Sequence, residues 1–169
     1  MKILIAQKAD ATALTNLFIG HISAHPEYIS HGEIQMGVGV GAIVDGALVA
    51  RTAPDAREKW MKYILMHIED SSIAEVWKLV SDDGALQGFC VADIESDGDA
   101  PFGMVCDVLV REEFRGHGAG EALLQTAIAW LRSRGIQDIY LESGKNNPAA
   151  HRFFEKRGFT HISEIYKLC

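Results

Sequence analysis

Cysteine and proline are both scarce in this chain, which has three Cys and four Pro among 169 residues. An odd number of cysteines without metal-ligand spacing disfavours a disulfide framework. Two of the three fall in apolar segments typical of strands, so we expect buried free thiols at Cys90, Cys106 and Cys169 and a reducing compartment. None of the seven histidines pairs at metal-ligand spacing within an expected helix, so no metal site is expected.

Long hydrophobic runs and an excess of positive charge are also missing. The apolar run near the N-terminus covers only residues 3–5, which is too short for a signal peptide or a membrane span. The formal net charge of −7 disfavours non-specific nucleic-acid binding and mildly favours a cationic partner. We therefore predict a cytoplasmic protein that binds neither nucleic acid nor a membrane.

No Pro/Gly/Ser-rich linker interrupts the chain. The composition, 48% hydrophobic and 23% charged, is that of an ordinary globular protein. The length is sufficient for one domain with a sizeable core, so a single domain over residues 1–169 is predicted.

Hydrophobic patterning predicts an alternation of strands and helices. The expected order is strand 2–7, helix 10–22, irregular segment 23–36, hairpin 38–50, helix 54–69, strands 73–80, 86–95 and 103–110, helix 119–134, strand 136–142, helix 148–157 and strand 160–168. Consecutive strands in the middle favour antiparallel pairing, and the later strand–helix–strand favours a parallel crossover. We predict an α+β, three-layer fold with a mixed, mostly antiparallel sheet and helices on both faces.

The richest local pattern is a glycine-rich turn, RGHGAG at residues 115–120, between an apolar strand and a helix. Glycines there allow positive φ and close approach of a ligand to the backbone. The following helix start offers unpaired N–H groups and a positive dipole end, which favour a phosphate.

Two common phosphate motifs do not fit this turn. The pattern G-x-G-x-x-G fails because Glu121 or Leu123 occupies its last position, and no Gly-Lys-Ser/Thr follows. The pattern R-x-x-G-x-G does fit, with Arg115, Gly118 and Gly120.

A second motif follows after an expected helix and strand. The segment NPAAHRFFEKRGF matches N-x-x-A-x-x-F-[YF]-x-x-x-G-[FY], with Asn147, Ala150, Phe153, Phe154, Gly158 and Phe159 in the motif positions. Together the two motifs resemble the cofactor elements of the GNAT acetyltransferase superfamily, closely over residues 73–168 and loosely before them. The resemblance implies the family's fold and an acetyl-CoA-dependent N-acetyltransferase that acts by direct attack of a primary amine in a ternary complex, without a metal.

The resemblance also implies which residues contact the cofactor. They are Val108, Leu109, Val110, Arg115, Gly116, His117, Gly118, Ala119, Gly120, Glu121, Asn147, Ala150, Arg152, Phe153 and Phe154. The backbone N–H groups of Val108–Val110 would polarise the thioester carbonyl, a role that does not depend on side chains.

Candidate catalytic groups are fewer. Asp107 is the acid on the strand before the loop and could bind the acceptor or remove its proton, or could be a structural carboxylate paired to a basic residue. Glu33 and Asp93 are alternative bases. Phe154 occupies a position where many family members have a proton-donating tyrosine, so Tyr166 or water would have to protonate the leaving thiolate.

The strand before the loop departs from the family as well, because Met104 and Cys106 stand where many members carry a Glu. These departures keep a second function open, a catalytically weak or inactive CoA-binding sensor or interaction module. The hairpin at 38–50, within an acceptor-side segment of about residues 20–60, is predicted from Asp45-Gly46. It could be a plain surface hairpin, an acceptor contact or the contact of a homodimer.

Overall fold

The computed structural model describes residues 1–96 and 100–168 and contains two compact units. The sheet unit consists of Met1–Phe18 and Trp60–Leu141. The second unit consists of Ile19–Lys59 and the chain from Glu142 onward. Each unit is assembled from segments distant in sequence, so neither is a contiguous half of the chain. The single domain over residues 1–169 stays a prediction.

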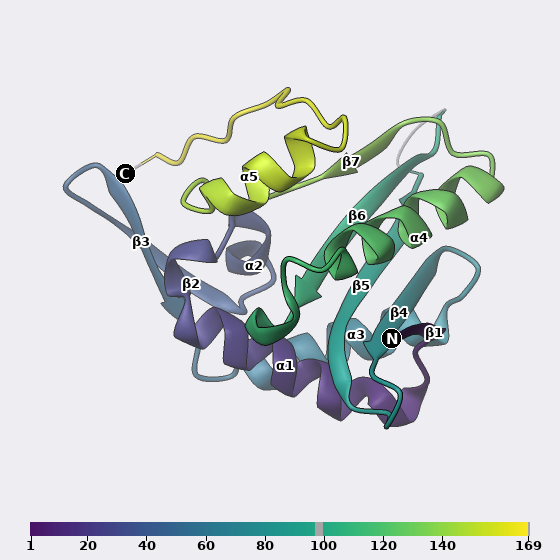
Figure 1. Cartoon of the computed structure of the whole chain (residues 1–169). Helices are drawn as coiled ribbons and strands as arrows, with labels where there is room; N and C mark the ends of the chain where they lie inside the picture. The colour runs from purple at the N-terminus through teal and green to yellow at the C-terminus, as the bar shows by residue number, and fades with distance from the viewer. Residues whose placement is uncertain (97–99, 169) are drawn as a thin grey trace. The chain divides into compact units, whose positions relative to one another are not determined.

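The sheet unit contains a five-stranded sheet of β1 (Lys2–Ile5), β4 (Ala74–Val80), β5 (Leu86–Glu95), β6 (Phe102–Val110) and β7 (Ile139–Leu141). The strand order is β1-β4-β5-β6-β7 (Figure 1). All neighbours pair antiparallel except β6 and β7, which pair parallel. The predicted mixed, mostly antiparallel sheet is confirmed, and β5 has the predicted bounds.

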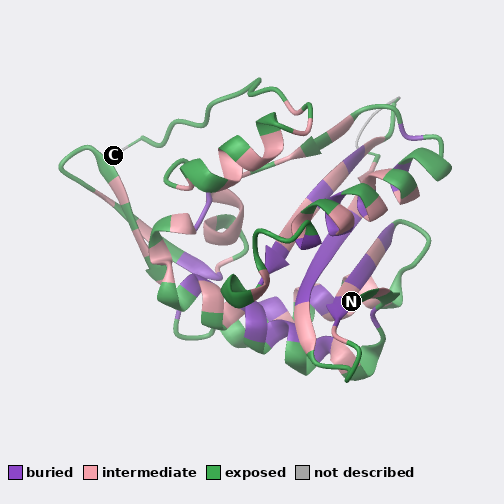
Figure 2. Ribbon diagram, viewed as in Figure 1, coloured by how far each residue is buried: buried purple, intermediate pink, exposed green. Residues whose placement is uncertain are grey.

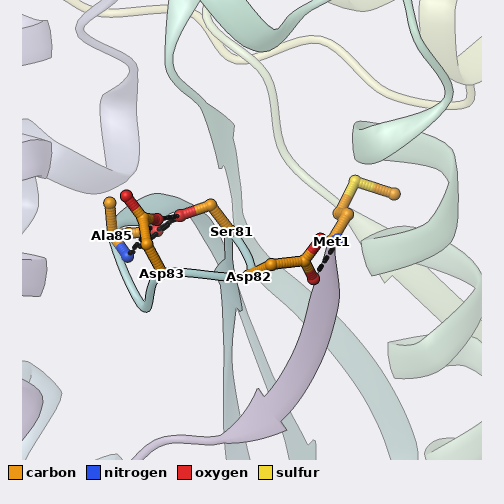
Figure 3. Close-up of polar contacts among 5 residues, drawn as sticks. All are labelled: Met1, Ser81, Asp82, Asp83 and Ala85. Carbon is orange, nitrogen blue, oxygen red and sulfur yellow. Dashed lines mark hydrogen bonds and ion pairs between the residues drawn. The ribbon is translucent and has the colours of Figure 1, made fainter.

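A tight turn joins β4 to β5 (Figure 3). The Ser81 hydroxyl donates to Asp83 and accepts from the Ala85 backbone N–H at 3.0 Å. The Met1 ammonium pairs with Asp82 at 3.2 Å. Gly84 has φ +87°, a left-handed conformation that favours glycine, and this turn sets the β4–β5 register.

Helices cover both faces of the sheet. Along β5, Phe89 and Cys90 point to opposite faces, because side chains alternate along a strand. On the Phe89 face lies Trp60 of α3 (Ala56–Glu69), with ring centroids 5.5 Å apart. On the other face, Trp77, which pairs with Cys90, contacts Trp130 of α4 (Ala119–Ser133) at 5.8 Å.

The core of the sheet unit follows from this layering. Trp60 and Ile64, four residues apart on α3, are fully buried, whereas Ile68 is half-buried. Phe18, in α1 (Ala11–Ala24), stacks on Trp60 at 4.5 Å. Figure 2 shows the middle of β5 buried and the outward side of α4 exposed. Two 3₁₀ turns, η1 (Lys8–Asp10) and η3 (Glu112–Phe114), complete the unit.

The second unit contains the predicted hairpin, β2 (Gly39–Val44) and β3 (Ala47–Thr52), together with α5 (Pro148–Glu155). Asp45 and Gly46 both have positive φ, +50° and +77°, as the predicted two-residue type I′ turn requires.

Three expectations about elements were wrong. Segment 23–36, expected to be irregular, contains η2 (Pro26–Tyr28) and α2 (His31–Gln35). The expected strand 136–142 shortens to Ile139–Leu141. The expected strand 160–168 does not form, and residues 160–168 pair with no strand of the described chain. Alternation produces a strand only where an edge accepts it, and here Ile162 and Leu168 are 72% and 96% exposed.

Within residues 1–96 and 100–168, no helix has both the length and the apolar character that crossing a bilayer requires.

Candidate active site

The centre of the candidate site is an irregularity in β6. Val91 of β5 lies opposite Asp107, but the next residue, Ala92, lies opposite Val105, so Cys106 is an extra residue in β6. A bulge of this kind bends the strand and redirects side chains, and bulges are frequent beside active sites. Here the bulge lies shortly before Val108–Val110, the backbone that the family resemblance implies would polarise the thioester carbonyl.

Asp107 receives a hydrogen bond from α3. The Tyr63 hydroxyl donates to Asp107 Oδ2 at 2.9 Å. Burial raises the pKa of Tyr63 well above its ordinary value, and the negative charge of Asp107 raises it further. The phenol therefore stays protonated and serves as a donor to the carboxylate. Asp107 thus has a tyrosine among its partners.

One helical turn further along α3, His67 holds the second carboxylate. Its Nε2 lies 3.3 Å from Asp93 Oδ2, and its Nδ1 lies 2.9 Å from the Tyr63 carbonyl oxygen. Because a carbonyl can only accept, Nδ1 carries a proton, and Nε2 faces Asp93. Burial lowers the pKa of His67, but the hydrogen bonds and the charges of Asp93 and Asp107 outweigh it, so the pKa is raised.

Two of the cysteines are described, and both are free thiols. Cys90 is fully buried, which confirms the expectation for it, whereas Cys106 is free but only half-buried. Burial raises the pKa of both thiols, and the charges of Asp93 and Asp107 raise that of Cys106 further. A nucleophilic role for Cys106 is therefore disfavoured. Cys169 lies outside the described residues.

The glycine-rich turn has the backbone that a close approach needs. Gly116 and Gly118 have φ of +80° and +81°, and a Cβ at either position would meet no atom within 4 Å. The turn therefore requires glycine for its backbone conformation and leaves open space beside the chain. Gly118 is the N-cap of α4, with Ala119, Gly120 and Glu121 in the first helical turn.

The polar side chains of the turn bind the turn itself. Arg115 Nε donates to the Val110 carbonyl at 2.8 Å, and its Nη1 lies 3.5 Å from Glu112. His117 Nδ1 lies 2.8 Å from the Arg115 carbonyl. These contacts fix the turn onto the end of β6, so any phosphate contact falls first to the backbone N–H groups.

The second motif forms α5 and its cap. Asn147 Oδ1 accepts from the Ala150 N–H at 3.2 Å, and Pro148 occupies the first turn, where its missing N–H costs nothing. The ring of Phe154 packs edge-on against Phe153. The guanidinium of Arg157 lies 3.8 Å from the centre of the Phe153 ring. Arg152 is exposed.

The other two catalytic candidates have local roles in the second unit. Glu33 accepts hydrogen bonds from the backbone N–H of Ser30, at 2.6 Å, and from its hydroxyl. In return Ser30 Oγ accepts from the Gly32 N–H, so the pair forms a capping box for α2. Tyr166 is 86% exposed and donates to Glu164 at 2.6 Å.

Tyr63 and His67 were not singled out from the sequence. Their spacing of four residues places both on one face of α3, which was a usable indication. Apolar periodicity in this helix indicates that Trp60 and Ile64 are buried, but it does not indicate which polar side chains of the sheet contact the helix.

Comparison with known proteins finds similarity to acetyltransferases. The model of the acetyltransferase (GNAT) family matches residues 47–159. Mycothiol acetyltransferase of Thermobispora bispora is 40% identical over 80 residues, 46% of this chain and 27% of that protein. N-alpha-acetyltransferase 30 of Schizosaccharomyces pombe is 31% identical over 78 residues, 46% of this chain and 51% of that protein.

The matched segments span about half of the length of these curated relatives or less. A solved structure of a predicted acetyltransferase with acetyl-CoA from Clostridium acetobutylicum shares the fold, with a TM-score of 0.70 at 13% identity, covering 99% of this chain and 95% of that one. Because the family model matches more than half of its residues, the chain belongs to the acetyltransferase (GNAT) family.

Proposed function

We propose that this protein transfers an acetyl group from acetyl-CoA to a primary amine by direct attack in a ternary complex, with Asp107 acting on the acceptor amine. The observation that carries the proposal is the bulge in β6, where Asp107 immediately precedes the backbone of Val108–Val110. One strand thus offers a carboxylate for the amine and N–H groups for the thioester oxygen.

The chemistry divides into three tasks. The acceptor must lose a proton, because an alkylammonium with a pKa of about 10.4 is almost fully charged at neutral pH. Backbone N–H groups would stabilise the oxyanion of the tetrahedral species. The thiolate then leaves, and a free thiol pKa of about 8.5 makes it a tolerable leaving group without a matched acid.

The proposal that acetyl-CoA is the donor has separate support in each unit. In the sheet unit, the bare backbone of Gly116 and Gly118 beside the start of α4 suits a pyrophosphate. In the second unit, Phe153 and Phe154 of α5 would supply apolar contacts and exposed Arg152 a cationic one. Acetylation of a cationic acceptor in the cytoplasm completes the proposal.

Replacement of Asp107 by Asn tests the acceptor role. We expect kcat/KM for the amine to fall by ~100-fold or more, as general-base groups typically contribute, while acetyl-CoA affinity stays the same. Activity of the variant should recover as pH rises, because the amine then arrives neutral. Unchanged kinetics at neutral pH would move the role to Asp93, Glu33 or water.

A CoA-binding sensor or interaction module is the second candidate, and two observations favour it. Phe154 has no proton to donate, and the Tyr166 hydroxyl is exposed and bonded to Glu164. A panel of amines at saturating acetyl-CoA separates the two functions. An enzyme releases thiol steadily with at least one amine, whereas a pure binder is stabilised by CoA and releases none.

A further inference from the structure

The bulge brings together three side chains of different chemistry in the sheet unit. His67 comes from α3, Asp93 from β5 and Cys106 from β6. One nitrogen, one oxygen and one sulfur atom from these residues all lie within 4.8 Å of one another. They converge from three elements, so tertiary packing rather than local sequence assembles them.

We propose that His67, Asp93 and Cys106 form a binding site for a divalent transition-metal cation of the zinc class. Imidazole nitrogen, thiolate sulfur and carboxylate oxygen are the ligands that Zn²⁺ prefers. Mg²⁺ and Ca²⁺ prefer sites made of oxygen alone, so the sulfur and nitrogen select against them. The proposal does not depend on the acetyltransferase function.

The orientation of His67 supports the site. Its Nδ1 donates to the Tyr63 carbonyl at 2.9 Å, which fixes the ring and directs Nε2 toward Asp93. Metal-ligating histidines almost always donate the other ring N–H to a carbonyl or carboxylate in this way. The backbone of α3 therefore already supplies the contact that holds such a ligand in place.

Asp93 gives an independent indication of the metal site. Its Oδ1 is buried and has no hydrogen-bond partner of ordinary geometry within the described residues. A buried carboxylate oxygen without a partner is costly, and a bound cation would satisfy it. The Cys106 thiol faces the same carboxylate, so both would turn toward one point.

The geometry needs only a small contraction. Ligand bonds of about 2.0–2.3 Å in a tetrahedral site place the ligand atoms about 3.3–3.8 Å apart. The present separations lie within 4.8 Å, so binding would require the ligand atoms to approach one another by at most about 1.5 Å. Three protein ligands leave a fourth position for water, as in zinc sites that are not purely structural.

Titration of the reduced, metal-free 169-residue chain with Co²⁺ tests the site directly. Co²⁺ reports a thiolate ligand through a sulfur-to-metal charge-transfer band and tetrahedral geometry through intense visible bands. We expect both to saturate at one equivalent, and Zn²⁺ to abolish them because it binds such ligands more tightly than Co²⁺.

Matched variants identify the ligands. Cys106→Ser should lose the charge-transfer band, whereas Cys90→Ser and Cys169→Ser should keep it. Cys90 is a fair control because it is also a strand cysteine but lies outside the cluster. His67→Gln and Asp93→Asn should weaken Co²⁺ binding by more than ~10-fold, the loss that even outer contacts of metal sites typically cause.

The inference is overturned if the band is absent from the wild type, needs a large excess of metal, or survives in Cys106→Ser. Circular dichroism checks that each variant folds. If Cys106→Ser does not, Asp93→Asn decides, and unchanged affinity in it counts against the site. Because none of these readings uses acetyl transfer, failure of the proposed enzyme function would leave them intact.

Discussion

At the scale of single residues, one tyrosine and one histidine of α3 each contact a carboxylate of the sheet. Tyr63 donates to Asp107, and His67 contacts Asp93. Polar groups in a partly buried layer reduce stability unless they are paired, so α3 supplies the pairing that lets two acids lie beside the bulge.

Tyr63→Phe should therefore cost stability with little change in packing. A hydrogen bond to a charged group contributes about 1.5–3 kcal/mol, so the free energy of unfolding should fall by about that amount. Urea denaturation measures the change. Tyr140→Phe, at a 40% exposed tyrosine packed on Phe102, is the control and should change stability by less than about 0.5 kcal/mol. Equal effects of the two substitutions would contradict a stabilising Tyr63–Asp107 bond.

Phe154→Tyr tests whether departure of the thiolate limits the rate. If Phe154 lies beside the cofactor sulfur, a hydroxyl there should raise kcat, by up to the ~100-fold typical of general acids. The edge-on contact with Phe153 can persist, because the ring is unchanged. Phe159→Tyr, on the neighbouring ring, should leave kcat unchanged. A folded Phe154→Tyr enzyme with wild-type kcat would mean that sulfur protonation is not limiting.

At the scale of elements, the turn from β6 into α4 joins the carboxylate strand to the expected phosphate site. Arg115 ties the turn to the end of the strand, and Gly118 begins the helix in the left-handed conformation. Substitution in this turn should consequently affect the cofactor before it affects the acceptor.

Gly118→Asp should abolish stabilisation by CoA. The side chain brings a negative charge beside the expected pyrophosphate and also strains the backbone by about 1–2 kcal/mol. Gly135→Asp is the matched control, because Gly135 follows α4 with the same φ of +81° and equally open space. Thermal shift should show a CoA-dependent rise in Tm for the wild type and Gly135→Asp only. A similar rise in Gly118→Asp would refute the assignment of the loop.

At the scale of the molecule, the net charge affects how the protein attracts a charged acceptor. A charge of −7 attracts cations over distances comparable to the Debye length, which falls from about 30 Å at 0.01 M salt to about 8 Å at 0.15 M. Acceptor capture should therefore depend on the charge of the amine.

We expect kcat/KM for a diamine to fall more steeply with ionic strength than kcat/KM for a monoamine of similar size. Steady-state kinetics over a salt series at fixed pH measures both slopes. The monoamine controls for salt effects on acetyl-CoA binding, which both reactions share. Parallel slopes would show that net charge does not guide the acceptor.

Local features of the sequence determined much of the fold. The apolar run of β5, the Asp45-Gly46 turn and the periodic helix α4 depend on neighbours along the chain, so their positions could be predicted. The glycine turn likewise indicated the family, because backbone conformation at Gly116 and Gly118 requires glycine whatever surrounds it.

Tertiary structure alone decided the conformation of the C-terminal segment and the grouping of side chains at the bulge. Segment 160–168 has strand-like alternation but pairs with no strand of the described chain, and an edge partner cannot be read from the segment itself. The bulge at Cys106 depends on how β6 registers with β5, and only that register brings Asp93, Cys106 and Asp107 to Tyr63 and His67. The sequence supplied these side chains, and long-range packing placed them together, because contacts between distant segments leave no periodic trace in either one.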